Sequence, residues 1–209
     1  MKYYISDMHF FCSRVKRNTT LPIFRYRGFS DVDQMNSYMI RQWNAKISQV
    51  DEVFLVGDFS DGTAAQTAQI LKQLSGKKYL IVGEHDRFLM DPSFNPSQFG
   101  WIRDYAEIDD ESRTVNLFHY PAICYHDSHG GSYLLYGHIH DDIYTQGVIE
   151  HAEEDVKNFR GTKFYKNHII NCFCSYSDYA PLTLDEWIAN NQKRRQQRQQ
   201  QMQRNYPHE

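Results

Sequence analysis

Six acidic and imidazole side chains occur at spacings that suit a metal-dependent hydrolase: Asp7, His9, Asp58, His119, His138 and His140. Carboxylates mixed with imidazoles suit Mn²⁺, Fe, Zn²⁺ or Ni²⁺ better than Ca²⁺, which prefers all-oxygen ligands. A bound cation of this kind can lower the pKa of a water molecule to roughly 7 and so supply hydroxide at neutral pH. The residue types therefore predict a metal site that can activate water for hydrolysis.

The spacing within two pairs brings side chains to the same place. Asp7-x-His9 and His138-x-His140 each place two side chains on one side of a strand end, because side chains alternate along a strand. A residue without a Cβ lets the chain turn sharply, and a glycine precedes each of three polar clusters: Gly57, Gly83 and Gly137.

The candidate ligands follow short apolar runs that have the composition of buried strands. Ligands of α/β sheets bind beyond the carboxyl ends of the strands, so polar residues at these ends are expected to meet at one site. The runs are Lys2–Ser6, Glu52–Val56, Lys78–Val82, Arg113–Phe118 and Tyr133–Tyr136.

Helices are predicted between the early strands. Ser30 is a candidate N-cap, and an apolar stripe follows it: Val32, Met35, Met39, Trp43 and Ile47. A second helix is expected over Thr63–Leu74, with Gly76 as its stop and with one inward face: Ala64, Ala68, Leu71 and Leu74. The capping box Thr183–Glu186 predicts a last helix. Strands that alternate with helices predict an α/β layered fold.

Three long stretches have no clear periodicity and are expected to be loops that wall the pocket. They are Phe10–Phe29, Phe88–Trp101 and Asp141–Thr162.

The length of 209 residues is enough for one domain with a buried core, expected over residues 1–190, with a Gln/Arg-rich polar tail over 191–209. No run approaches the ~20 apolar residues that span a bilayer, and the first residues lack a secretory apolar segment, so a cytoplasmic protein is expected. The cysteines lack Cys-x-x-Cys spacing, and reduced thiols are expected: Cys12, Cys124, Cys172 and Cys174.

The net charge of −3 is unevenly distributed. Residues 191–209 hold five basic residues against Glu209, a balance of +4, so the remainder carries −7. An acidic body argues against a broad nucleic-acid-binding face, and it favours a pocket that concentrates cations.

Five motifs in order resemble those of the calcineurin-like metallophosphoesterases, over essentially residues 1–188. They are Asp7-Met-His9, Gly57-Asp58-Phe-Ser-Asp61, Gly83-Glu84-His85-Asp86, His119 and Gly137-His138-Ile-His140. The resemblance implies a β-sandwich flanked by helices, with two metal ions at the strand ends. It implies that Asp7, His9 and His140 hold one metal, that His119 and His138 hold the other, and that Asp58 bridges them.

The same resemblance implies that His85 contacts the phosphate and protonates the leaving oxygen, and that Asp61 orients this histidine. Asp61 could equally be the N-cap of the helix that starts near Thr63. Asp86 is expected to stabilise a turn. Arg87 and His129 are candidate substrate contacts, although the His126–His129 cluster also has the character of a polar loop near the pocket.

Two positions depart from the family pattern. Glu84 stands where the motif normally has Asn, and a carboxylate is anionic and only accepts hydrogen bonds when ionised. Glu84 could ligate the second metal, point away or crowd the phosphate; the working hypothesis is that it ligates and that activity is low. Cys12 stands where similar small proteins often have His, and it could be an auxiliary ligand or a small buried hydrophobe.

The preferred function is hydrolysis of a phosphodiester or small phosphomonoester, with a small or nucleotide-like substrate and two divalent ions, Mn²⁺ first among them. The competing hypotheses are a nuclease of the same fold and a metal-binding scaffold whose chemistry is reduced by Glu84. A basic groove beside the metals would favour the nuclease.

Overall fold

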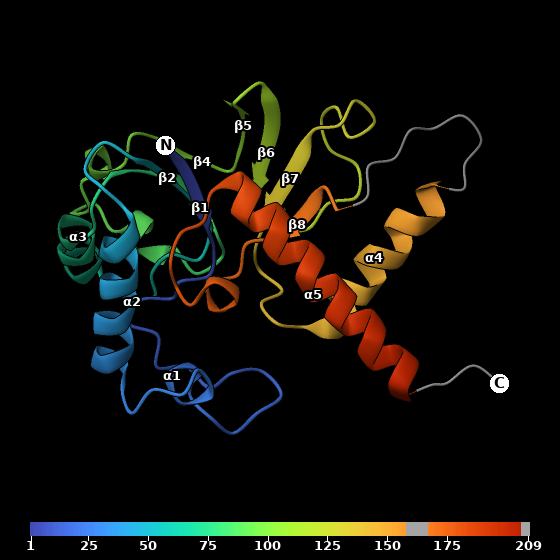
Figure 1. Cartoon of the computed structure of the whole chain (residues 1–209). Helices are drawn as coiled ribbons and strands as arrows, with labels where there is room; N and C mark the ends of the chain where they lie inside the picture. The colour runs from blue at the N-terminus through green and yellow to red at the C-terminus, as the bar shows by residue number, and fades with distance from the viewer. Residues whose placement is uncertain (158–166, 206–209) are drawn as a thin grey trace.

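Two four-stranded sheets form the centre of the computed structural model, which describes residues 1–157 and 167–205 (Figure 1). The first sheet contains β1 (Lys2–Ile5), β2 (Glu52–Val56), β3 (Lys77–Ile81) and β4 (Ile102–Arg103), in that order and all parallel. The second contains β5 (Tyr105–Asp110), β6 (Arg113–Phe118), β7 (Tyr133–Tyr136) and β8 (Ile169–Asn171). In this sheet β5 pairs antiparallel with β6, and the other neighbours are parallel.

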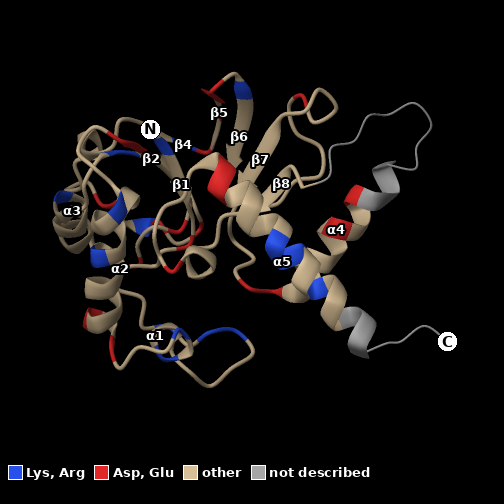
Figure 2. Cartoon of the chain, viewed as in Figure 1, with Lys and Arg blue, Asp and Glu red and all other residues tan. Residues whose placement is uncertain are grey.

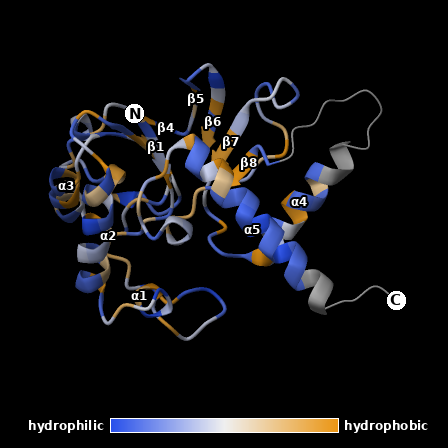
Figure 3. Ribbon diagram, viewed as in Figure 1, coloured by the Kyte–Doolittle hydropathy of each residue, from blue (hydrophilic) through white to orange (hydrophobic). Residues whose placement is uncertain are grey.

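One apolar core contains side chains from both sheets, and Figure 3 shows the hydrophobic colour concentrated on the strands. Tyr4, Phe54 and Tyr79 are aligned on β1, β2 and β3, and their rings stack with centroid separations of 5.5 and 4.8 Å. Leu117, Leu135 and Ile170 contribute from the second sheet to the same cluster. The predicted α/β fold, with a β-sandwich flanked by helices, is therefore confirmed.

Helices α2 (Val32–Lys46) and α3 (Ala64–Gln73) cover the outer face of the first sheet through a second apolar core. The N-cap of α2 is Asp31 and not Ser30, because Asp31 Oδ1 accepts the Gln34 N–H at 2.7 Å. Thr63 caps α3, so Asp61 is not its N-cap.

The inward face of α3 differs in part from the prediction. Ala64, Leu71 and Leu74 are buried as expected, but Thr67 and Ile70 take the place that was assigned to Ala68, which is only half-buried. Gly76 follows the helix with a φ of +82°, in agreement with its predicted role as a stop.

Two of the three stretches that were expected to be loops contain short helices. The first includes α1 (Ile23–Tyr26), and the second includes two 3₁₀ turns, Arg87–Met90 and Pro96–Gln98. The third is mostly a real helix, α4 (Ile143–Lys157), so the loop expectation was wrong there; residues 158–162 of this stretch lie outside the described residues.

The last helix, α5 (Leu184–Asn205), begins at the predicted capping box, since Thr183 N donates to Glu186 Oε2 at 2.8 Å. It runs straight through residue 190 and beside α4, so the residues expected to form the tail continue a helix as far as Asn205 (Figure 1). Arg195 and Arg198 of this segment form ion pairs with Glu150 and Glu153 of α4. The division of the chain at residue 190 stays a prediction.

Candidate metal centre

The candidate ligands lie on turns directly after the strands, and their backbones are unusual. Five of them have φ between +50° and +70°, a left-handed conformation that costs a non-glycine residue of order 1–3 kcal/mol: Asp7, His9, Asp58, His138 and His140. Asp and His tolerate this region better than most residues. The turns bring the side chains of Asp7, His9, Asp58 and His140 close to one another.

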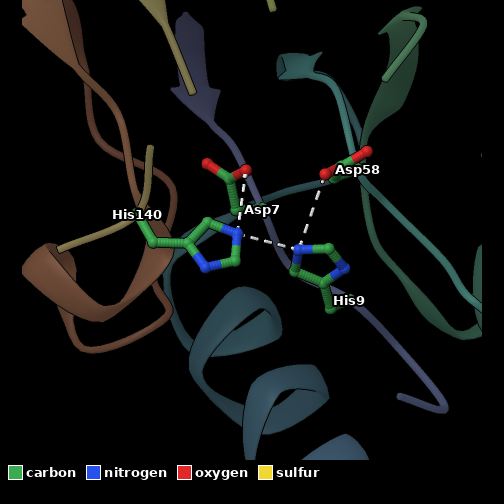
Figure 4. Close-up of side chains that lie close together, drawn as sticks. All are labelled: Asp7, His9, Asp58 and His140. Atoms are coloured by element: carbon green, nitrogen blue, oxygen red, sulfur yellow. Dashed lines mark hydrogen bonds and ion pairs between the residues drawn. The ribbon is translucent and has the colours of Figure 1, made fainter. Parts of the chain in front are cut away.

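Four side chains from both sheets converge on one point (Figure 4). His9 Nε2 lies 3.0 Å from His140 Nε2 and 3.6 Å from Asp58 Oδ2, and His140 Nε2 lies 3.4 Å from Asp7 Oδ1. Asp7, His9 and Asp58 are buried, and His140 is partly exposed. Two carboxylates and two imidazole nitrogens in this arrangement can all bind the same cation.

A second pair of histidines lies on the other side of Asp58. His119 Nε2 is 3.4 Å from Asp58 Oδ2, so this oxygen stands between His9 and His119. The His119 and His138 rings meet edge to face with centroids 5.3 Å apart. His119 Nε2 is completely buried and has no hydrogen-bond partner. A buried polar atom without a partner is costly, and a cation is the natural partner for this one.

Outer contacts fix the orientation of two of these imidazoles. His119 Nδ1 donates to Val56 O at 3.0 Å, and His9 Nδ1 donates to Asp61 Oδ2 at 2.8 Å. Each contact places the proton on Nδ1 and leaves the Nε2 lone pair facing the site, which is the arrangement of metal-binding histidines. Asp61 thus contacts His9 more closely than His85, whose Nδ1 is 3.8 Å from Asp61 Oδ1.

Two glycines permit the close packing of the site. A Cβ on Gly57, whose φ is +86°, would overlap the ring of His119. A Cβ on Gly83 would overlap the carboxylate and backbone nitrogen of Asp58. These glycines are required by the approach of a ligand, in addition to the sharp turn that the sequence predicted.

Asp86 holds the turns that carry Asp58 and Gly83. Its buried carboxylate accepts backbone N–H groups from Asp58 (3.0 Å), Phe59 (2.8 Å) and Gly83 (2.9 Å). Burial raises the pKa of Asp86 to about 7, while these N–H donors favour its ionised form. The predicted role in stabilising a turn is therefore confirmed.

The charges within the site are strongly coupled. Burial opposes ionisation of Asp7, but the hydrogen bond with His140 and the nearby imidazoles hold the pKa of Asp7 below its ordinary value. Burial opposes protonation of His119, but Asp58 and Asp7 outweigh it and raise the pKa of His119 to about 9. The buried carboxylates therefore attract positive charge, whether a proton or a cation.

Glu84 and His85 face each other at the exposed side of the site. Glu84 Oε1 lies 3.0 Å from His85 Nε2, and the Glu84 side chain is 49% exposed. The backbone N–H of His85 donates to Asp58 Oδ1 at 2.8 Å, which ties this loop to the centre. Donor atoms of Asp58, Glu84 and His85 also lie within 4.8 Å of one another, so Glu84 is within reach of a cation.

For three other candidate site residues, Arg87, His129 and Cys12, the structure gives less support for a role in the site. Arg87 is exposed two residues after His85, and His129 is exposed in a turn; within residues 1–157 and 167–205, no hydrogen bond or ion pair joins either side chain to the ligands. Cys12 lies within reach of His9 and Asp61. Burial raises the pKa of Cys12 to about 11.

Several residues that sequence reasoning missed support the ligand turns. Arg27 donates to the carbonyl oxygens of Asp7 and Met8, both at 2.8 Å. The carbonyl oxygen of His140 accepts from three side chains, which are Asn171 at 2.8 Å and Gln146 and Tyr176 at 3.3 Å. These residues are dispersed along the chain and form no local motif, so no pattern in the sequence identified them.

Comparison with known proteins is consistent with this site. A sequence model described as calcineurin-like phosphoesterase matches residues 3–198, nearly the whole chain. An uncharacterised protein of Methanocaldococcus jannaschii, MJ1445, is 33% identical over 88 residues, which is 41% of this chain. That match spans about half the length of the relative (47%).

A solved structure has a similar fold. It is AQ665 from Aquifex aeolicus, described as a protein of unknown function, and it superposes with a TM-score of 0.59. The superposition covers 89% of this chain and 96% of that one, at 22% sequence identity. At this identity, the likeness concerns the fold alone.

Proposed function

The chain belongs to the calcineurin-like phosphoesterase family, and on that basis we propose that it hydrolyses a phosphodiester or a small phosphomonoester with the help of two divalent metal ions. The observation that carries the proposal is the buried Nε2 of His119, which has no hydrogen-bond partner and lies 3.4 Å from Asp58 Oδ2. Such an atom is explained by a second cation beside the one that the Asp7, His9 and His140 side chains can hold.

The donor set divides between two sites. Asp7, His9 and His140 would hold one ion, His119 and His138 the other, and Asp58 Oδ2 would bridge them. When bound, the two ions supply Lewis acidity to the phosphate and lower the pKa of a water molecule. Mixed carboxylate and imidazole donors suit Mn²⁺, which we favour, and also Fe, Zn²⁺ or Ni²⁺.

His85 is the proposed general acid. It lies at the exposed rim, its backbone N–H is fixed by Asp58, and its ring is close to both Asp61 and Glu84. In the reaction, a water molecule loses one proton to solvent and its oxygen bonds to phosphorus, the ester P–O bond breaks, and the proton of His85 passes to the leaving oxygen; His85 then takes up a proton from solvent. Asp61 holds His9, and Asp61 Oδ1 lies 3.8 Å from His85 Nδ1.

The test is an assay of protein that has been stripped of metal and reloaded with Mn²⁺. A chromogenic phosphodiester and the matching monoester serve as substrates, and Asp58→Asn serves as the blank. We expect metal-dependent turnover that is lost in Asp58→Asn, with the diester preferred. Two bound ions without turnover of either ester would overturn the proposal and favour a metal-binding scaffold.

A further inference from the structure

A basic loop at residues 13–30 lies beside the candidate centre. It contains five basic residues and no acidic one: Arg14, Lys16, Arg17, Arg25 and Arg27. The whole chain carries −3, so the other residues together carry −8. Figure 2 shows this blue segment around α1, with no red within it. The acidic body therefore has one strongly basic segment near its centre.

The basic loop has a defined backbone. Val15 pairs with Pro22 in an antiparallel bridge, Lys16 N donates to Leu21 O at 2.9 Å, and Ile23 N donates to Arg14 O at 2.8 Å. Ile23 is buried in the core that covers the first sheet. The loop is thus a small hairpin whose base is anchored, and its charged side chains have a fixed backbone to extend from.

Two sets of contacts join the hairpin to turns that follow strands of the two sheets. Arg14 Nε donates to Asp61 Oδ1 at 2.8 Å, and Asp61 in turn contacts His9. Lys16, two residues further on, pairs with Asp141, and Tyr26 Oη donates to Asp141 Oδ2 at 2.6 Å. Asp61 follows β2 and Asp141 follows β7, so the hairpin connects ligand turns of the two sheets.

Some of these basic side chains keep N–H donors that can bind a further anionic group. Arg14 uses Nε and Nη2 on Asp61, and its side chain is 45% exposed. Arg17 and Arg25 are exposed, and neither forms an ion pair with any residue in the described part of the chain. Arginine donors that are fixed on one edge and open on the other suit phosphate oxygens.

We infer that the basic loop binds a second phosphate group of the substrate, so that the preferred substrate is a phosphate ester with another phosphate nearby. The reacting phosphate would lie beside the two metal ions and His85, and Glu84 adds negative charge there. The basic side chains of the loop can offset the repulsion between Glu84 and the substrate only if the substrate carries a second anionic group that reaches them. This inference rests on the proposed function, because it assigns a substrate class to the same site.

The first experiment compares binding, so that it does not depend on turnover. Adenosine 3′,5′-bisphosphate and adenosine 5′-monophosphate are titrated into the Mn²⁺-loaded protein by calorimetry. We expect the bisphosphate to bind about tenfold more tightly, as one charge-assisted contact would give. The difference should disappear in Arg14→Gln/Arg17→Gln and should narrow as salt is raised. The matched control is the Arg41→Gln variant, which changes an exposed arginine on α2 and should keep the difference in affinity between the two nucleotides.

A second experiment measures turnover with a matched pair of substrates. They are the p-nitrophenyl ester of thymidine 5′-phosphate and the same ester with an added 3′-phosphate. A higher kcat/KM for the phosphorylated ester, lost in the double variant, supports the inference. Turnover of both esters at equal rates contradicts the inference and leaves the proposed function standing. A tighter-bound bisphosphate without any turnover contradicts the proposed function alone.

The length of the ligand that competes best distinguishes the two possible sources of the second phosphate, which are a nucleic acid end and a free nucleotide. A short single-stranded oligonucleotide that competes better than the bisphosphate would identify a nucleic acid end, and the reverse order would identify a free nucleotide. Equal binding of mono- and bisphosphate by the unmodified protein overturns the inference, and so does a preference that survives in the double variant.

Discussion

At the scale of single residues, most candidate ligands are fixed by contacts that do not involve a metal. His119 and His9 each use Nδ1 on an outer oxygen, and Asp7 Oδ1 accepts the backbone N–H of His138 at 2.9 Å. The Nε2 atoms are therefore aimed before any ion binds. Such a site loses little conformational entropy on metal binding, which favours high affinity.

Glu84→Asn tests the one departure within the ligand motifs. We expect weaker Mn²⁺ binding, because a carboxylate within reach of Asp58 is removed, and a higher kcat, because His85 Nε2 loses the partner at 3.0 Å. Metal content by mass spectrometry and turnover of the chromogenic diester measure the two effects. If metal affinity and rate both stayed unchanged, Glu84 would have no part in the site.

The candidate ligands were the easiest part of the site to find in the sequence, because they lie in the turns that follow strands; that they bind metal stays a prediction. Their supporting residues were not predictable, since Asn171 and Tyr176 meet the carbonyl of His140 only in the folded chain. The role of Asp61 was predicted only in part. A spacing of three residues from Asp58 placed it near the site, but only the fold determines that it contacts His9 at 2.8 Å.

At the scale of elements, the strands that lead to candidate ligands were predicted well, but β4, β5, β8 and α4 were missed. Its buried face carries Gln146, Ile149 and Glu153, while Ile143 is 71% and Val148 51% exposed. The apolar residues of α4 are therefore divided between its buried and exposed faces, and they form no single apolar stripe in the sequence. The short β4 and the charged β5 gave no strand pattern either, because the neighbouring strands and not their own composition define them.

The buried ion pair between α4 and α5 gives an element-scale prediction. Glu153 is fully buried and pairs with Arg195. Arg195→Met should destabilise the fold by about 3 kcal/mol, because it leaves a buried carboxylate without this ion-pair partner, and adding Glu153→Leu should recover most of the loss. Urea denaturation measures both. Arg113→Met, whose partner Asp185 is 70% exposed, should cost less than about 1 kcal/mol. Equal losses in the two single variants would contradict the prediction.

The connection between α2 and β2 gives a prediction for acid stability. The hydroxyl and backbone N–H of Ser48 donate to Asp51 at 2.6 and 2.8 Å, and with the N-terminal ammonium they lower the pKa of Asp51 to about 2. A carboxyl whose pKa is lower in the folded state stabilises the fold above its unfolded pKa, and this contribution is lost as the pH falls from about 4 to 2. Asp51→Asn should therefore lower the melting temperature at pH 7, and the difference should shrink below pH 4. A difference independent of pH would exclude this linkage.

At the scale of the whole molecule, the candidate centre lies where the two sheets meet. β1 and β2 supply Asp7, His9 and Asp58, and β6 and β7 supply the remaining histidines. Cations that bind these residues hold both sheets together, and so metal binding should stabilise the entire fold. In the described part of the chain, none of the helices is both long and apolar enough to cross a membrane.

Metal removal tests this dependence. At a Mn²⁺ concentration 100 times the dissociation constant, binding adds about 2.7 kcal/mol per site, which corresponds to a rise of about 5–10 °C in melting temperature for a chain of this size. Calorimetry of the chelator-treated and Mn²⁺-reloaded protein measures the shift. The Asp58→Asn variant should show little of this rise in melting temperature. Identical melting temperatures with and without Mn²⁺ would mean that the ligands are not shared between the sheets as proposed.

The left-handed backbone at five of the ligands also restricts which substitutions can be interpreted. At these positions a candidate ligand must combine a donor atom with tolerance of positive φ, and Asp, Asn, His and Gly tolerate positive φ best. An alanine variant of Asp7 or His138 would change backbone energy as well as chemistry, so its phenotype would mix misfolding with lost function. Asn is the informative replacement, because it keeps the turn while it alters the ligand.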